Sequence, residues 1–144
     1  MAKRYRKTRL AGVRDRLLTR MLRRGKGPPD IWLITVPGRR SGRPYTTPVS
    51  PVEDGGARWL VAPYGEVAWV RNVRAAGRLT LTRGERSEEV RADEVAPAEA
   101  APVLRRYLAA NRLIKRYFDA TANSSDDDLR AEAARHPVFR LTPA

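Results

Sequence analysis

Two short segments of this 144-residue chain carry residue types that could bind an anionic ligand. The first, residues 36–44, reads Val-Pro-Gly-Arg-Arg-Ser-Gly-Arg-Pro. Its glycines permit a tight turn with outward-pointing N–H groups, and the guanidinium groups of Arg39 and Arg40 and the hydroxyl of Ser41 are donors that suit a phosphate. The segment is not a Walker A loop, because it lacks the Gly-Lys-Ser/Thr ending and a following helix. Arginines in a surface hairpin can also be merely solvated, so the turn alone does not decide the ligand.

Thr46, Thr47 and Pro48 follow this turn in a run of strand-forming residues. Proline cannot donate a hydrogen bond to a sheet ladder, so Pro48 predicts an edge strand or a bulge. Backbone groups at such an edge are free to meet a ligand.

The second segment, residues 61–72, reads Val-Ala-Pro-Tyr-Gly-Glu-Val-Ala-Trp-Val-Arg-Asn. It predicts a strand that turns at Pro63 and Gly65 and enters a short helix, whose first N–H groups could meet an anion or a planar heteroaromatic ring. Trp69 and Asn72 are one helical turn apart and can line that site. A core position is the alternative interpretation for Trp69.

The hydrophobic pattern predicts the elements that must position these segments. Strands are expected at residues 31–36, 46–52, 58–62, 78–82, 86–90 and 138–141, and helices at 66–76, at 98–120 and from about residue 129. The turns Asp54-Gly55-Gly56 and Arg83-Gly84-Glu85 join neighbouring strands as hairpins. An α+β fold follows, a small antiparallel barrel of about six strands with flanking helices.

Positive charge is concentrated at the N-terminus. The net charge is +13, and 11 of the 29 basic residues lie in the first 26 positions beside one acid, Asp15. Apolar residues recur there at three- and four-residue steps: Leu10, Val13, Leu17, Leu18, Met21 and Leu22. We therefore expect an amphipathic basic helix over residues 1–27, followed by one domain at 28–144. Its apolar stripe could pack on that domain, or residues 1–26 could contact an anionic membrane. Nucleic acid is disfavoured, because only Tyr5 could stack on a base there.

Composition excludes several kinds of chemistry. The chain has no cysteine, which excludes thiolate catalysis and Cys-ligated zinc, and its single histidine, His136, cannot form a multi-histidine metal site. No metal is therefore expected, and redox chemistry would require a bound cofactor. No signal peptide or apolar run of about 20 residues is found, which predicts a cytoplasmic protein, with membrane association left open.

The order and spacing of these segments resemble the deazaflavin-dependent nitroreductase and quinone reductase family, split-barrel proteins that bind coenzyme F-420. The resemblance covers nearly the whole chain. It rests on residues 38–44, residues 46–48, Asp54-Gly55-Gly56, Trp69 with Asn72, Ala75-Ala76-Gly77 and residues 136–141.

The resemblance implies a split β-barrel and an oxidoreductase. Such an enzyme passes a hydride from reduced coenzyme F-420 to a small organic acceptor, which is a quinone, a nitro compound or an activated alkene. Implied cofactor contacts are Arg39, Arg40, Ser41, Gly42, Thr46, Thr47, Pro48, Ala62, Pro63, Tyr64, Gly65, Ala68, Trp69 and Asn72.

Tyr64, Tyr107 and Tyr117 are candidates for the acceptor side, because a phenol can stack on an acceptor and donate a proton. Core packing is the alternative for the latter two. The chain departs from the family at Tyr45, where members often carry arginine, and in its short loop at residues 65–68.

Two other functions stay open at this point. One is a split-barrel enzyme that uses FMN, and the other is a non-enzymatic module that docks through the basic helix. The sequence does not identify the acceptor or the oligomeric state, and His136, just before Pro137, is expected to be a structural residue and not a proton donor.

Overall fold

The computed structural model describes residues 9–144, and the side chains of residues 16–111 and 114–144. Basic residues expected in the N-terminal helix at positions 3, 4, 6 and 7, and Tyr5, lie outside the described residues. In chain order the elements are α1 (Arg9–Arg23), β1 (Trp32–Pro37), β2 (Pro44–Val49), β3 (Val52–Asp54), β4 (Ala57–Val61), α2 (Ala68–Ala76), β5 (Arg78–Arg83), β6 (Arg86–Glu94), α3 (Pro97–Ala110), the 3-10 helix η1 (Arg112–Tyr117), α4 (Asp126–Glu132) and β7 (Val138–Pro143).

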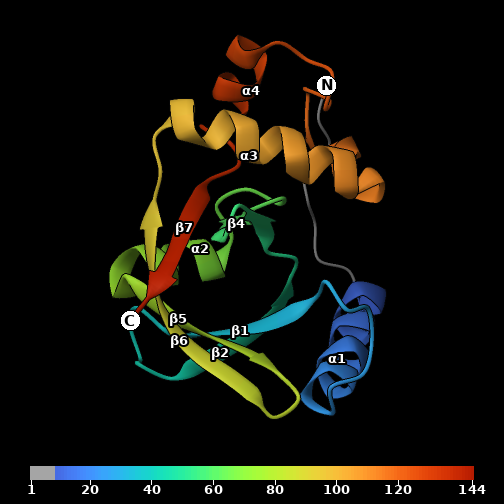
Figure 1. Ribbon diagram of the computed structural model, residues 1–144. Helices are drawn as coiled ribbons and strands as arrows, with labels where there is room; N and C mark the ends of the chain where they lie inside the picture. Colours follow the sequence, from blue (N-terminus) through green and yellow to red (C-terminus); the bar gives the residue numbers. More distant parts are fainter. Residues whose placement is uncertain (1–8) are drawn as a thin grey trace.

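Seven strands of the described chain form one antiparallel sheet in the order β2-β1-β5-β6-β7-β4-β3. Its two edge strands, β2 and β3, are consecutive in the chain, with only Ser50 and Pro51 between them. In a flat sheet these edges would be about 29 Å apart, at about 4.8 Å per strand. The link from Val49 to Val52 reaches at most about 11 Å. The sheet must therefore curl until its edges approach each other, which confirms the α+β split barrel (Figure 1).

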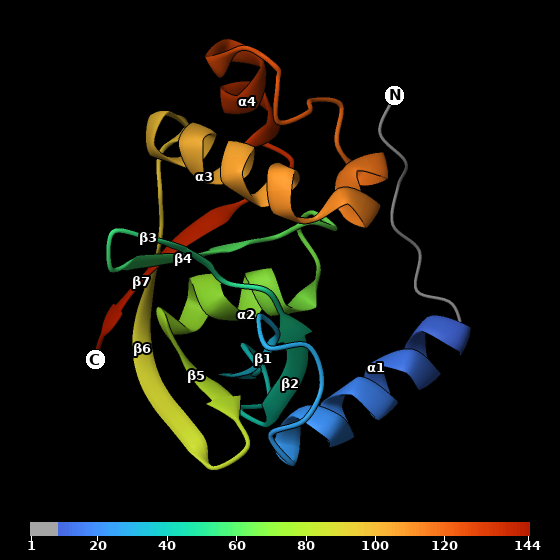
Figure 2. The same ribbon diagram turned by 45° about the vertical axis from the view of Figure 1, so that its right-hand side comes forward.

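Two hydrophobic cores form on the two faces of this curled sheet. Helix α2 lies between the β3–β4 part and the β5–β1–β2 part of the sheet (Figure 2), and its Val70 and Val73 pack with Leu60 and Phe139. Helix α3 covers the opposite face of β4 and β7. Trp59 belongs to this second core, so that alternate residues of β4 serve the two cores.

The expected elements differ from the structure at two breaks. The strand expected at 46–52 is divided by Ser50 and Pro51 into β2 and β3, which gives seven strands instead of six. The helix expected at 98–120 ends at Asn111, whose φ of −122° and ψ of 72° are not helical. Both predicted hairpins are confirmed, and Gly77 ends α2 in the left-handed conformation with φ 68°.

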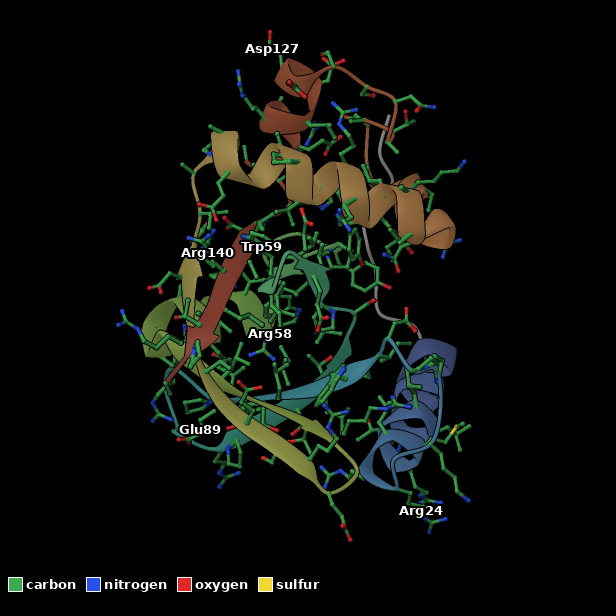
Figure 3. The ribbon with its side chains drawn as sticks, viewed as in Figure 1. Arg24, Arg58, Trp59, Glu89, Asp127 and Arg140 are labelled. Atoms are coloured by element: carbon green, nitrogen blue, oxygen red, sulfur yellow. The ribbon has the colours of Figure 1, made fainter. Side chains whose placement is uncertain are left out.

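A hydrogen-bonded network joins α3 to the outer face of β4 and β7. Glu99 accepts a hydrogen bond from Trp59 Nε1 at 3.0 Å, and the Arg140 guanidinium lies 5.9 Å from the Trp59 ring (Figure 3). On the neighbouring surface, Arg58 makes two hydrogen bonds to Glu88, and this pairing lowers the pKa of the Glu88 carboxyl. These arginines are occupied by structural contacts.

Helix α1 is attached to the sheet through its C-terminal end. Leu22 is fully buried, and its carbonyl accepts a hydrogen bond from Gly84 N–H at the tip of the β5–β6 hairpin. Gly25 and Gly84 approach so closely that a Cβ on Gly84 would lie 3.0 Å from the Gly25 Cα. Leu17 is nevertheless 56% exposed and Met21 44% exposed, so the domain covers only part of the apolar stripe.

None of the helices within residues 9–144 combines the length and the apolar character that crossing a bilayer requires.

Arg83 fastens the segment after α1. Its guanidinium donates hydrogen bonds to the carbonyl oxygens of Gly27, Pro28 and Ile31 at 2.7–2.9 Å. We expect Arg83→Ala to lower the free energy of unfolding by about 2 kcal/mol, because three carbonyls lose a charged donor. Urea unfolding measures this loss. Arg91→Ala, at an exposed ion pair of 3.9 Å, is the control and should change stability by less than about 0.5 kcal/mol. If the two variants were equally stable, the role of Arg83 in holding the segment after α1 would be contradicted.

Candidate active site

The arginine-rich turn between β1 and β2 is closed by its own hydrogen bonds. Gly38 N–H donates to Arg43 O at 2.8 Å, Gly42 N–H donates to Gly38 O at 2.9 Å, and Arg43 N–H donates to Ser41 Oγ at 3.2 Å. The outward-pointing N–H groups expected from the sequence are thus largely used inside the turn. Its capacity to bind an anion lies mainly in its guanidinium groups and in the Ser41 hydroxyl.

Asn72 holds this turn against α2. Its Oδ1 accepts two hydrogen bonds from Arg39, one from the backbone N–H at 3.1 Å and one from Nη1 at 2.9 Å. Asn72 is only 3% exposed, so the link is shielded from water on the helix side. The structure thereby joins two candidate residues that the sequence places 33 positions apart.

The outer part of the turn carries donors that could bond to an anion. Arg40 and Arg43 are exposed, and neither guanidinium makes an ion pair with a side chain that the structure describes. Gly42 has φ 72°, and a Cβ there would meet nothing within 4 Å, so its surface is open. Tyr45, the departure from the family pattern, covers the other side: a Cβ on Gly38 would lie 2.6 Å from its ring.

Strand β2 runs from this turn along the edge of the sheet, as Pro48 predicts. Thr46 and Thr47 are half-buried, and the Thr46 hydroxyl lies 3.0 Å from the Thr35 hydroxyl on β1. The outer backbone groups of this edge strand are not paired within the described sheet.

The second candidate segment begins with a tight turn after β4. Gly65 N–H donates to Ala62 O at 3.2 Å, with Pro63 and Tyr64 at the corner, and Gly65 adopts φ 83°. Helix α2 follows at Ala68, and no side chain caps its N-terminus. Ala68 is exposed and Trp69 is half-buried, with its ring 6.1 Å from Phe139. The core and site interpretations of Trp69 are therefore compatible.

The three candidate tyrosines gather in one cluster. The rings of Tyr64 and Tyr117 meet edge to face at 5.1 Å, and Tyr107 lies 6.4 Å from Phe118 in the same region. Tyr107 is buried, as its core alternative expects, and burial, with a smaller effect of Tyr64, raises the pKa of its hydroxyl. Tyr64 is 36% exposed and is the most accessible of the three.

Two buried polar residues lie beneath this cluster: Glu132, which sequence reasoning missed, and His136, which the sequence predicts to be structural and not part of the site. His136 is 5% exposed, stacks on Phe118 at 3.8 Å, and its Nδ1 lies 3.1 Å from the Ala62 carbonyl oxygen. Glu132 is 1% exposed and accepts hydrogen bonds from two backbone N–H groups of another segment. Glu132 is the last residue of α4 and His136 lies four positions further, beyond the helix, so only the burial of a Glu could have marked them.

A family model decides what kind of protein carries this site. The model described as F420H(2)-dependent quinone reductase matches residues 7–126. The chain belongs to this family. It is an oxidoreductase that depends on coenzyme F-420, as the resemblance in its sequence implies. No curated protein matches the chain significantly in sequence.

Solved structures share the fold of this quinone reductase family member. A structure described as an F420-H2 dependent reductase is 21% identical, with a TM-score of 0.57, over 78% of this chain and 94% of its own. A domain-swapped dimer is 21% identical, with a TM-score of 0.61, over 94% of this chain and 100% of its own. A FAD-binding protein from Mesorhizobium loti is 13% identical, with a TM-score of 0.52, over 89% of this chain and 88% of its own. At these identities the likeness establishes the fold alone.

No group of three or more histidines or carboxylates that could hold a metal ion occurs among the described residues.

His136 gives the protein a predictable pH dependence. Burial lowers the pKa of His136, although the Ala62 carbonyl and Glu132 oppose this effect. The unfolded chain then binds more protons than the folded protein below about pH 6.5, so the free energy of unfolding falls as the pH is lowered, by at most about 1.4 kcal/mol per pH unit. Urea unfolding from about pH 8 to about pH 5 measures this slope. His136→Phe should remove this part of it, and an unchanged slope would show that His136 does not contribute.

Proposed function

We propose that this protein transfers a hydride from reduced coenzyme F-420 to a quinone, with the cofactor phosphate at the turn of residues 38–43 and the quinone beside Tyr64 and Tyr117. The observation that carries this proposal is the pairing of two features in one family member. The guanidinium groups of Arg40 and Arg43, in a turn at the sheet edge, make no ion pair with a described side chain, and a cluster of tyrosines lies beside the turn that leads into α2.

Cofactor binding is assigned to the residues whose donors face outward. Arg40 and the free donors of Arg39, with the Ser41 hydroxyl, would hold the phosphate beside the open Gly42. Thr46, Thr47 and Pro48 would run along the cofactor on β2. Residues 62–65 with Ala68 and Trp69 would frame its ring system, because the N–H groups at the start of α2 are uncapped there.

The chemistry requires one hydride and one proton. The bound cofactor supplies the hydride, and the quinone becomes a hydroquinone when it also takes up a proton. Tyr64 is suited to donate a hydrogen bond or a proton to the quinone oxygen, because its ring is partly exposed and packed against Tyr117. Tyr107 is buried in the same region, with its ring 6.4 Å from Phe118, and would not reach the quinone. Nitro compounds and activated alkenes need the same hydride and proton.

The phosphate assignment predicts a loss of cofactor affinity. Replacing Arg39 and Arg40 together with Ala removes two guanidinium groups, each worth about 1.5–3 kcal/mol when bonded to a charged partner. We expect the Kd for coenzyme F-420 to rise at least about tenfold, measured by equilibrium titration of the oxidised and reduced cofactor. Arg91→Ala on β6 also removes one positive charge, but outside the turn, and it should leave the Kd for coenzyme F-420 unchanged. Unchanged affinity in the double variant would refute the assignment.

The reaction itself is tested with menadione. The protein should oxidise reduced coenzyme F-420 with this quinone, and NADPH should not replace the cofactor. Tyr64→Phe keeps the ring and loses the phenol, so kcat should fall by about tenfold or more. Trp69→Ala should impair the reaction by raising the Kd for the cofactor. Tyr45→Phe, an exposed tyrosine outside the cluster, is the matched control. Quinone reduction supported equally by NADPH with added FMN would overturn the cofactor role in favour of an FMN enzyme.

A second proposal concerns the basic N-terminal segment, residues 1–27, which contains α1 and precedes the domain that we propose at 28–144. We infer that its exposed apolar residues, Leu17 and Met21, contact an anionic membrane surface, since exposed Arg20, Arg23 and Arg24 flank them. Such a contact would bring a cytoplasmic enzyme close to membrane-dissolved quinones.

Vesicle sedimentation tests the membrane contact. The protein should bind phosphatidylglycerol vesicles at low salt and bind phosphatidylcholine vesicles weakly. Replacing both Leu17 and Met21 with Ser should weaken binding at least about tenfold, whereas Met21→Leu, which keeps the apolar surface, should not. Deleting residues 1–26 is a poorer test, because it also removes the buried Leu22. If the wild type fails to sediment with anionic vesicles, the contact does not exist.

A further inference from the structure

The buried carboxylate of Glu132 ties α4 to the segment after η1. Its Oε1 accepts hydrogen bonds from the backbone N–H groups of Asp119 and Ala120, both at 2.6 Å. Its Oε2 is buried without a hydrogen-bond partner and lies 3.4 Å from Arg135 Nη2 and 3.5 Å from His136 Nε2. The residues it holds begin two positions after Tyr117, so Glu132 fixes the chain that carries this tyrosine.

His136 ties the same region to the end of β4. Its ring stacks on Phe118, and its Nδ1 lies 3.1 Å from the carbonyl oxygen of Ala62, two residues before Tyr64. The neighbouring backbone adds further contacts to this turn. Ala62 N–H donates to Pro137 O at 2.9 Å, and a Cβ on Gly65 would lie 3.2 Å from Arg135 O. The segment 132–137 therefore contacts both chain segments that bring the tyrosine rings together.

Glu132 and His136 are unusual in this protein because they are polar side chains that are almost fully buried. The buried polar side chains among those that the structure describes are Asn72, Glu132 and His136. Asn72 fixes the arginine turn, and the other two lie beneath the tyrosine cluster. A buried carboxylate with one oxygen that accepts no hydrogen bond is not needed to stabilise a fold, because apolar packing of the same volume would often do as well. What Glu132 adds is a fixed position for two backbone N–H groups that no apolar side chain could bond.

We infer that Glu132 and His136 are positioning residues for acceptor binding, which hold the Tyr64 and Tyr117 segments in the contact that the quinone requires. This inference rests on the proposed role of these tyrosines. His136 itself does not touch the acceptor, since it is nearly fully buried beneath Phe118. A misplacement of about 1 Å at a positioning group is enough to change rates and affinities greatly.

Three variants separate positioning from general stability. Glu132→Leu removes both backbone acceptor bonds, and Glu132→Gln keeps a carbonyl oxygen that can accept them. Arg105→Ala is the control, because Arg105 bonds Ala122 O and Asp126 and so holds α4 without touching Glu132 or His136. We expect Glu132→Leu to raise the KM for menadione about tenfold with an unchanged Kd for coenzyme F-420. Glu132→Gln should restore KM to within about threefold, and Arg105→Ala should lower Tm without raising KM.

The contact between the Tyr64 and Tyr117 rings can also be measured without enzymatic turnover, as a nuclear Overhauser effect. It should be lost in Glu132→Leu and kept in Glu132→Gln and Arg105→Ala. If Glu132→Leu does not fold, His136→Phe, which keeps the ring stack and loses the Ala62 bond, takes its place with the same expected losses. A folded variant of either kind that keeps both the ring contact and the wild-type KM overturns the inference.

The failure of the proposed acceptor site gives a different result. Tyr64→Ala and Tyr117→Ala would then leave the KM for menadione unchanged, which refutes the acceptor role of the cluster and with it the functional part of the inference. If these variants raise KM and the Glu132 and His136 variants do not, the acceptor site stands and only the positioning role is wrong.

Discussion

The two-residue connection between β2 and β3 is the constraint on which the rest of the structure depends. Because Ser50 and Pro51 must join opposite edges of a seven-stranded sheet, the sheet has to curl, and its concave face has room for α2. Val70 and Val73 fill that face. Only with α2 inside the curl can Asn72 reach the β1–β2 turn and bond Arg39. The placement of the arginine turn against α2 therefore depends on the closure of the barrel.

Buried polar side chains appear in this protein where two segments distant in sequence must keep a fixed relation. Asn72 spans 33 positions to Arg39, and Glu132 reaches back to Asp119 and Ala120. Apolar packing alone tolerates small shifts between such segments, whereas a buried hydrogen bond loses its stabilisation when its geometry is lost. These bonds fix the positions of the arginine turn and of the segment beneath the tyrosines, the two candidate halves of the site.

Local signals account for what the sequence predicts well. The hairpins at Asp54-Gly55-Gly56 and Arg83-Gly84-Glu85, the stop at Gly77 and the edge position of Pro48 each follow from the backbone preferences of a few adjacent residues. The division of a strand at Ser50 and Pro51 is not predicted from the sequence. Asn111 is a possible break in the helix expected at 98–120, and α3 ends there, with Asn111 Nδ2 donating to Tyr107 O at 2.9 Å. The grouping of Tyr64 with Tyr117, and the burial of Glu132, depend on contacts that no local pattern encodes.

The abundance of arginine shows why the partners of a residue matter more than its type. Arg58 on β4 is paired with Glu88, Arg74 on α2 is paired with Glu66 and Glu94, and Arg83 bonds backbone carbonyls. These side chains add to the net charge, yet their donors are already engaged. Arg40 and Arg43 have no such partner among the described side chains, so they can form new bonds to an anion without first breaking old ones. A charge count alone does not distinguish these five arginines. The hydrogen bonds of the folded chain do, and they favour the turn as the place for a phosphate.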